Sequence, residues 1–318
     1  MSGSPAPSLP PAFVERLSEV GSCSGVEVDW SAFGERATAF RCNSLKTDAA
    51  SLRAELESAG LALRPVPGID GAFAVAGEQR RALTGTRANA EGRLFIQNPS
   101  SMVPPLALDP QPGEEVLDLA AAPGGKTSHI AALMGNSGRI AAVDSARPRF
   151  FRLRRTLEQL GVTNAGTYLR DGAGVWKVRP EHFDRVLLDA PCSGEGRFTT
   201  ADTASFARWS ERKVAQMVRR QRRLLYSAVR ALKPGGVLVY CTCTFAPEEN
   251  ELIVEWALRR FACMRLEAVE FELPSASAGI TRWRNRELDP DLKRALRIWP
   301  DGVMEGFFVA RLRKTAGG

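Results

Sequence analysis

The apolar residues in the middle of the chain follow two patterns in turn, short continuous runs and helical spacing. Residues 116–119 form a short apolar run that is typical of a buried strand. From Thr127 onward, apolar residues such as Ile130 and Met134 recur at helical spacing. Residues 120–126 must then form a strand-to-helix turn. Because ligands in open α/β sheets bind beyond the carboxyl ends of the strands, this turn is the first candidate ligand site.

The same alternation continues to residue 240. Four further apolar runs predict strands, at residues 138–144, 167–169, 183–188 and 237–240. An arginine-rich stretch predicts a helix over 147–160, with Phe151, Leu153, Leu157 and Leu160 facing inward. A second, longer helix is expected to end at Leu232. Repeated strand–helix alternation favours an α/β fold with a doubly wound, parallel sheet, whose strand ends meet at one edge.

The first ninety residues have shorter and more mixed patterns. They predict a helix from Phe13 and another from about Thr47, and strands at 37–43, 63–66 and 72–75. This is a small α+β unit. The composition of Gly85 to Gly92 suits a connection, so we predict a disordered tail over 1–10, a small domain over 11–92 and a large domain over 93–318.

The composition of the central turn indicates which ligand it holds. A phosphate-binding P-loop would need glycine where Ala120 stands, and a dinucleotide fingerprint needs three spaced glycines, whereas this turn has Gly124 and Gly125 after Pro123. S-adenosylmethionine, which carries ribose hydroxyls but no phosphate, is the remaining common ligand. Asp144 ends the next strand, about twenty residues on, as expected for a ribose-binding carboxylate. Taken alone, a glycine pair after a strand is as often a turn without a ligand as a ligand-binding turn.

Composition narrows the class of protein. A formal charge of +7, carried mostly by arginine, points to a polyanionic partner. Six cysteines in 318 residues are too few for a disulfide framework, and the N-terminus reads as neither a signal peptide nor a membrane span. We therefore expect a cytoplasmic protein with reduced thiols. No metal is expected, because the chain has two histidines and its CxC sequence lacks a second cysteine pair at zinc spacing.

Thiols and acids follow the last two predicted parallel strands. The sequence DAPCSG places Asp189 and Cys192 after one strand, and CTC places Cys241 and Cys243 after the next. A lone free cysteine is most often a small buried hydrophobe. Two thiols and an acid at adjacent strand ends, beside a predicted methyl-donor turn, are harder to explain by packing alone.

Four motifs in order resemble those of the RNA cytosine-5 methyltransferases. They are AAAPGGKT at 120–127, LLDAPCSGEG at 187–196, LKPGGVLVYCTCTFAPEENE at 232–251 and GFFVARLRK at 306–314. Together with FIQNPSSM at 95–102, these motif sequences are most similar to those of the bacterial enzymes that methylate 16S ribosomal RNA of the small subunit. The resemblance covers roughly residues 36–315. It implies a seven-stranded, Rossmann-like methyltransferase domain behind an N-terminal domain similar to RNA-recognition folds.

The resemblance also implies the roles of individual residues. Cys243 resembles the nucleophile that adds to C6 of cytosine, Cys192 the cysteine that assists its release, and Asp189 the acid that engages N3. Pro247, followed by two glutamates, is interpreted as a helix start that would help Cys243 to ionise. The implied S-adenosylmethionine contacts are Ala120, Ala121, Ala122, Pro123, Gly124, Gly125, Lys126, Asp144, Asp171 and Asp189.

Two departures from the family pattern bear on these expectations. Cys241 stands where the family usually has serine, and side-chain alternation in a strand could bring it to the same face as Cys243. The chain also stops soon after residue 314, where similar bacterial enzymes carry a further RNA-binding domain. The sequence thus predicts a monomeric rRNA cytosine-5 methyltransferase, with tRNA as second candidate substrate. A non-catalytic ribosome-assembly factor is the rival, and a nicotinamide-dependent enzyme is disfavoured by the turn.

Overall fold

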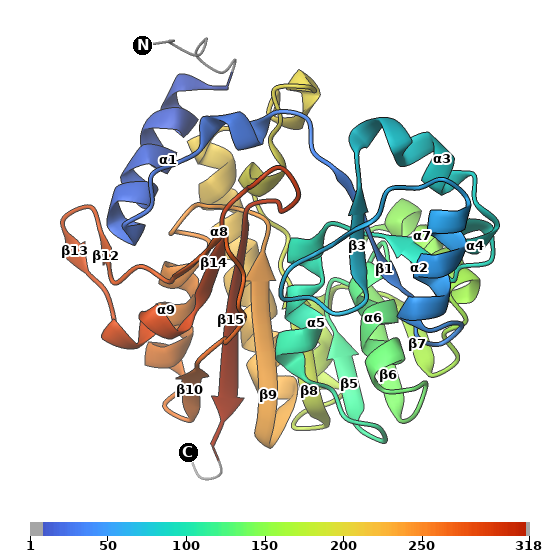
Figure 1. Cartoon of the computed structure of the whole chain (residues 1–318). Helices are drawn as coiled ribbons and strands as arrows, with labels where there is room; N and C mark the ends of the chain where they lie inside the picture. The colour runs from blue at the N-terminus through green and yellow to red at the C-terminus, as the bar shows by residue number, and fades with distance from the viewer. Residues whose placement is uncertain (1–8, 316–318) are drawn as a thin grey trace, which may run out of the picture.

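The computed structural model describes residues 9–315. Within these residues, two main sheets lie beside each other, a small one from the N-terminal part and a large one from the rest (Figure 1). Within the described residues, no helix is both long and apolar enough to cross a membrane. The same residues contain no cluster of three histidine, cysteine or acidic side chains placed to hold a metal ion.

The small sheet contains four antiparallel strands in the order β2-β3-β1-β4. Their bounds are β1 Thr38–Cys42, β2 Arg64–Pro65, β3 Ala72–Val75 and β4 Leu94–Ile96. Helix α2 (Ala49–Ser58) begins where the Asp48 carboxylate accepts a hydrogen bond from the Ser51 amide, at 2.8 Å. Its buried Leu52 and Leu56 pack with Phe40. The short helices α3 (Arg80–Thr84) and α4 (Arg87–Ala90) lead into β4.

Two elements differ from the predicted division at Gly92. Strand β4 lies beyond that residue and completes the small sheet by pairing with β1. Helix α1 (Pro11–Ser24) packs in the core of the large unit, where the Phe13 and Phe198 rings lie 4.9 Å apart. Both differences have one cause. Strand β4 and helix α1 each pack against residues on the other side of the predicted connection, residues 85–92. Local composition alone does not predict such distant contacts.

The large sheet has the strand order β11-β14-β15-β9-β8-β5-β6-β7, and β10 also pairs with β15. Its parallel strands are β5 Glu115–Asp118, β6 Arg139–Asp144, β7 Ala165–Leu169, β8 Phe183–Asp189 and β9 Leu232–Thr242. Its antiparallel strands are β10 Met264–Glu267, β11 Ala276–Ala278, β14 Leu296–Ile298 and β15 Phe307–Lys314. The α/β class is confirmed. Nine strands replace the predicted seven, because β10 and β14 share the outer edge of β15 and β11 extends β14.

Helices cover both faces of the large sheet (Figure 1). Helices α5 (Val103–Leu108), α6 (Gly125–Leu133) and α7 (Arg147–Gln159) pack on the face that carries Ile140 and Ala142. Helices α8 (Glu211–Ala231) and α9 (Glu251–Arg260) pack on the opposite face. A separate hairpin joins β12 (Arg282–Trp283) to β13 (Arg286–Glu287).

The inward face of α7 differs from the prediction at one position. Leu153, Leu157 and Leu160 are buried as expected, but the Phe151 side chain is 52% exposed. Phe150 packs inward instead. The reason is helical spacing, because residues 150, 153 and 157 share one face of the helix and residue 151 lies about 100° further round.

Candidate active site at the strand ends

The carboxyl ends of β8 and β9 bring the two cysteine motifs together. Asp189 pairs with Cys241 in the parallel register of these strands, and the Ala190 amide donates to the Cys241 carbonyl at 2.9 Å. In the loops just beyond, the Sγ atoms of Cys192 and Cys243 lie 3.3 Å apart. The predicted convergence of the two thiols is therefore present in the structure.

The loop that follows Cys192 is held against Cys243 by its backbone. The Gly196 amide donates a hydrogen bond to the Cys243 carbonyl at 3.0 Å. Gly196 must be glycine because a Cβ there would lie 1.9 Å from the carbonyl oxygen of Gly306. This close backbone packing fixes the position of one thiol relative to the other.

The surroundings of the two thiols differ in their effect on ionisation. The hydrogen bond from Cys192 and the positive charge of Arg197 lower the pKa of the Cys243 thiol, against the opposing effect of burial. The same hydrogen bond, together with burial, raises the pKa of the Cys192 thiol. We therefore assign Cys192 as the S–H donor and Cys243 as the thiolate acceptor.

Arg197 is a site residue that the sequence reading missed. It lies five residues after Cys192, at the end of the short 3₁₀ helix Glu195–Arg197, so only its closeness to the DAPCSG motif could have drawn attention to it. Its guanidinium folds back over the loop, since a Cβ on Gly194 would lie 3.2 Å from its Nη2 atom. The negative charge of ionised Cys243 in turn raises the pKa of Arg197.

Removing this charge should make Cys243 harder to ionise. We expect Arg197→Gln to raise the pKa of the Cys243 thiol and to slow its alkylation by iodoacetamide at pH 7 by about fivefold. Because the lowered pKa is the cause, the rates of variant and wild type should converge well above pH 9. Arg197→Lys keeps the charge and serves as the control. Equal alkylation rates for Arg197→Gln and wild type at pH 7 would contradict this role.

The predicted helix start at Pro247 is wrong. Residues 247–250 form turns, in which the Glu249 amide donates to the Ala246 carbonyl, and α9 begins at Glu251. Buried Glu249 accepts hydrogen bonds from the Ser193 amide at 3.0 Å and from Gln221 at 2.7 Å. Burial raises the pKa of Glu249 to about 8. This carboxyl group thus joins the Cys192 loop to the turn after Cys243. The pKa of Cys243 is lowered by Cys192 and Arg197, and not by the N-terminus of a helix.

Asp189 forms an ion pair with Lys126, across the site from its own loop. The Lys126 Nζ atom lies 2.8 Å from Asp189 Oδ2 and 5.2 Å from the centre of the Phe307 ring. Burial lowers the pKa of Lys126, but Asp189 and the nearby thiols outweigh it, and the net shift is upward. Lys126, in the first turn of helix α6, therefore places a positive charge beside Asp189.

Cys241 occupies a different position from Cys243. It is fully buried, and its Sγ atom lies 3.7 Å from Asp189 Oδ1. Burial raises the pKa of the Cys241 thiol, and the negative charge of Asp189 adds to the effect. Cys241 therefore faces Asp189, and Cys243 is the residue of this pair that meets Cys192.

The central turn has the close backbone packing that its glycines predict. Gly124 has φ of 107°, in the left-handed region, and opens helix α6. A Cβ on Gly125 would lie 2.9 Å from the Phe95 ring. The two glycines thus let the turn fit between α7 and the small sheet, and Ala120 to Pro123 follow directly from β5.

Two acids at the ends of β5 and β6 show whether S-adenosylmethionine fits beside the turn. Asp144 is buried and accepts hydrogen bonds from the Ala122 and Ala146 amides, at 3.2 and 2.8 Å. Asp118 accepts from Thr127 at 2.7 Å, and its other oxygen is buried without a partner in the described structure. Burial raises the pKa of Asp118 to about 7. An unpaired buried acceptor beside the turn is consistent with a ligand that donates hydrogen bonds there.

A cavity of about 470 Å³ borders the same edge of the sheet. Ser145, Asp171 and Ala173 line one side and Arg220 of α8 lines the other. Asp171 is exposed and pairs with Arg223 at 3.3 Å. Of the residues predicted to hold the donor, only Asp171 lines this cavity, and Ser145 on its wall directly follows Asp144. The buried Asp144 and the unpaired oxygen of Asp118, beside the glycine turn, fit the predicted group.

Comparisons with known proteins match this chain to RNA methyltransferases. The family profile described as "16S rRNA methyltransferase RsmB/F" matches residues 105–313. The ribosomal RNA small subunit methyltransferase F of Cronobacter sakazakii is 37% identical over 316 residues, which cover 97% of this chain and 64% of that protein. The tRNA (cytosine(49)-C(5))-methyltransferase of Pyrococcus abyssi is 43% identical over 226 residues, covering 70% of this chain and 71% of that protein.

Solved structures agree in the fold. A methyltransferase homologue from Pyrococcus horikoshii has a TM-score of 0.80 and 34% identity, and the match covers 96% of this chain and all of that one. The NSun6 structure from the same organism has a TM-score of 0.81 at 22% identity, with 98% of this chain covered. The chain spans less than two thirds of the length of the small-subunit methyltransferases that it matches. With the family profile matching well over half of its residues, the chain belongs to the 16S rRNA methyltransferase RsmB/F family.

Proposed function

We propose that this protein transfers a methyl group from S-adenosylmethionine to C5 of a cytosine in RNA. The observation that carries the proposal is the 3.3 Å contact between Cys192 and Cys243 at the strand ends next to the glycine turn. S-adenosylmethionine is the cofactor of the family and supplies the methyl group as a sulfonium. A non-catalytic RNA-binding assembly factor would have no need of a thiol pair beside a donor turn.

In the proposed reaction, Cys243 acts as the nucleophile. Its thiolate adds to C6 of cytosine, and the electron pair of the C5–C6 double bond then becomes available at C5. C5 takes the methyl group as the sulfur–methyl bond of the sulfonium breaks, which leaves a neutral thioether. Because N3 of cytosine accepts hydrogen bonds, Asp189 would engage it as a protonated carboxyl group that donates. The Lys126 ammonium group, 2.8 Å from Asp189, is placed to balance the negative charge that develops on the ring. The lowered pKa of Cys243 favours the thiolate that this first step requires.

Release of the product needs a proton to leave C5 and the Cys243–C6 bond to break. The C5 proton goes to a base, the electrons of the C5–H bond re-form the C5–C6 double bond, and Cys243 departs as a thiolate. Cys192 is the S–H donor to that sulfur and is placed to stabilise the departing thiolate. In this assignment the two cysteines act in opposite halves of one cycle.

The substrate that we propose is 16S ribosomal RNA, with tRNA as the alternative. Proteins named as small subunit rRNA methyltransferases match 97% of the chain, and the Pyrococcus abyssi tRNA enzyme supports the alternative. The target cytosine must be unpaired or flipped out, since duplex RNA hides its base edges. The small N-terminal sheet is the proposed RNA-recognition unit. We further propose that the protein acts as a monomer in the cytoplasm.

One assay tests this function directly. The protein is incubated with labelled S-adenosylmethionine and either 16S rRNA, small subunits or tRNA from cells that lack cytosine-5 methylation, and the nucleosides are separated by mass spectrometry. We expect 5-methylcytosine in the ribosomal RNA. Label in tRNA alone would favour the alternative substrate. RNA binding with no methylated product on any of the three substrates would favour the assembly-factor function.

A further inference from the structure

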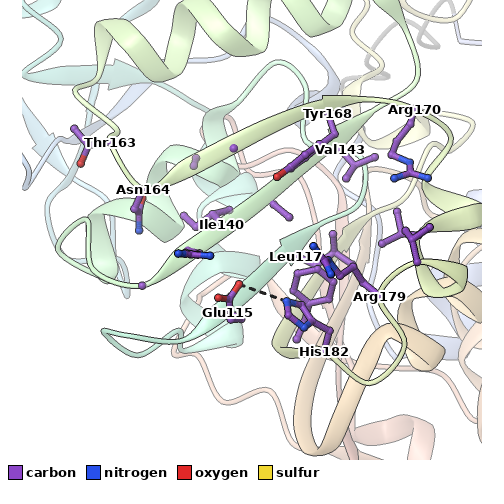
Figure 2. A pocket seen from close by; sticks show the side chains of 18 residues that line it. Glu115, Leu117, Ile140, Val143, Thr163, Asn164, Tyr168, Arg170, Arg179 and His182 are labelled. Carbon is purple, nitrogen blue, oxygen red and sulfur yellow. Dashed lines mark ion pairs between the residues drawn. The ribbon is translucent and has the colours of Figure 1, made fainter.

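A second cavity lies on the large sheet, away from the cysteines. Its volume is about 740 Å³, and it opens over β5, β6 and β7 toward their amino-terminal ends. Figure 2 shows Tyr168 and Arg170 on one side of this cavity, and Glu115 and His182 on the other. None of the residues proposed above to bind the donor or to react with RNA lines it.

The cavity exists because the connection from β7 to β8 contains little regular structure. Helices α6 and α7 cover the other face of these strands. On this face, the connection forms only a six-residue 3₁₀ helix, Gly172–Lys177. Leu117, Ala141 and Val143 form an apolar floor that this short helix does not fully cover. The structure therefore leaves a pocket with an apolar base on the face opposite α7.

Three arginines surround the opening without a carboxylate partner. Arg139, Arg170 and Arg179 are exposed, and within residues 9–315 no acidic oxygen lies within 4.0 Å of their guanidinium groups. The acid at the rim, Glu115, is 3.8 Å from His182 (Figure 2). Other arginines of the large unit do form ion pairs, such as Arg311 and Arg313 with Glu267. The rim thus carries three arginines against one glutamate, which leaves a net positive charge.

An aromatic ring stands among these charges. The Tyr168 side chain is 49% exposed on the edge strand β7 and lies along that strand over Gly166. A Cβ on Gly166 would come within 3.0 Å of the Tyr168 hydroxyl oxygen. Glycine at this position gives the ring room to lie along the strand, at the wall of the cavity. A flat aromatic surface beside unpaired guanidinium groups matches the two parts of a nucleotide, its base and its phosphate.

We propose that this cavity binds a nucleotide of the single-stranded RNA that flanks the methylation target, with its phosphate at the arginines and its base against Tyr168. The proposal rests on RNA being the substrate. Charge complementarity favours RNA over a protein partner, because three unpaired guanidinium groups around an apolar base suit phosphate oxygens. The cavity reaches Arg170, which adjoins Asp171 at the donor site, so a strand bound there can continue toward the reactive edge.

Crosslinking and binding test the site without requiring turnover. A single-stranded RNA of about 20 nucleotides that contains 4-thiouridine is irradiated with the wild-type protein, and the modified peptide is mapped. We expect a crosslink to the peptide that carries Tyr168. The triple variant Arg139→Gln, Arg170→Gln, Arg179→Gln should bind this RNA about tenfold more weakly at 0.15 M salt, with a salt slope smaller by about two. Tyr168→Ala should lose roughly fivefold.

The matched control changes three exposed arginines of α7 outside the cavity, as Arg152→Gln, Arg154→Gln, Arg155→Gln. An equal loss of RNA affinity in this control would overturn the proposal, as would a crosslink confined to other peptides. Tight binding of free 5′-AMP without competition by RNA would reassign the cavity to a small nucleotide and overturn the RNA assignment. If the crosslink forms but no RNA is methylated, the site stands and the proposed function fails. If RNA is methylated but no crosslink to the Tyr168 peptide forms, the proposed function stands and the cavity is not an RNA site.

Discussion

Cys243→Ser is expected to lower methyl transfer to RNA by on the order of a thousandfold or more, while the fold and the binding of S-adenosylmethionine persist. A serine hydroxyl is far harder to ionise than this thiol, whose pKa is lowered by the Cys192 hydrogen bond and by Arg197. Without a thiolate at C6, the ring never becomes electron-rich at C5. The measurement is single-turnover formation of 5-methylcytosine, with donor affinity measured by calorimetry.

Cys241→Ser is the matched control for that experiment. It makes the same change two residues away, at a thiol that faces Asp189 and does not face Cys192. We expect this variant to keep most of the activity. Retained activity in Cys243→Ser together with a large loss in Cys241→Ser would transfer the nucleophile to Cys241. Full activity in both variants would refute covalent catalysis by this segment.

The parts of the site that sequence could predict are those set by strand order. Parallel strands place their carboxyl ends at one edge, so the acids and thiols after β8 and β9 were expected to meet, and Cys192 and Cys243 do lie in contact. The apolar runs that predict β3 and β8 end within one residue of the observed strands. These features depend on local patterning, which a single sequence carries.

The parts that sequence could not predict depend on contacts between distant segments. The charge that acts on Cys243 comes from Arg197, in a loop whose course is set by the close approach of Gly196 and Gly306. Pro247 and the glutamates after it have the composition of a helix start, yet Glu249 turns inward to the Cys192 loop and the helix begins two residues later. Tertiary hydrogen bonds override local propensity at both places.

The same limit applies to the domain division. Helix α1 has an ordinary amphipathic pattern that does not reveal which unit it contacts, and its Phe13 packs with Phe198 and Phe245 of the large unit. The ion pair of Lys126 with Asp189 is similar, since it joins a turn and a strand end 63 residues apart. In each case the type of residue was visible in the sequence, but its partner was not.

Cys192→Ala is expected to trap the protein on its RNA substrate. The nucleophile, the donor site and the Asp189–Lys126 pair remain in this variant. Addition to C6 and methyl transfer should therefore still proceed, although more slowly, because Cys243 keeps Arg197 but loses the hydrogen bond that lowers its pKa. What is lost is the S–H group 3.3 Å from the Cys243 sulfur, whose raised pKa keeps it protonated and available to stabilise the departing thiolate. Breakdown of the Cys243–C6 bond should become the slow step, and the covalent adduct should accumulate.

The adduct is measured as a protein–RNA species that survives denaturing electrophoresis, with RNA labelled at its 5′ end. We expect it in Cys192→Ala in the presence of S-adenosylmethionine, with the added methyl group found on the trapped nucleotide. The double variant Cys192→Ala, Cys243→Ser should give none, which shows that the bond is to Cys243. Cys243 forms the sulfur–carbon bond and Cys192 assists its breakage. The Cys243 variant should therefore form no adduct, whereas the Cys192 variant should accumulate it. Unimpeded turnover by Cys192→Ala, with no adduct at any time, would remove Cys192 from the release step and leave the 3.3 Å contact as packing alone.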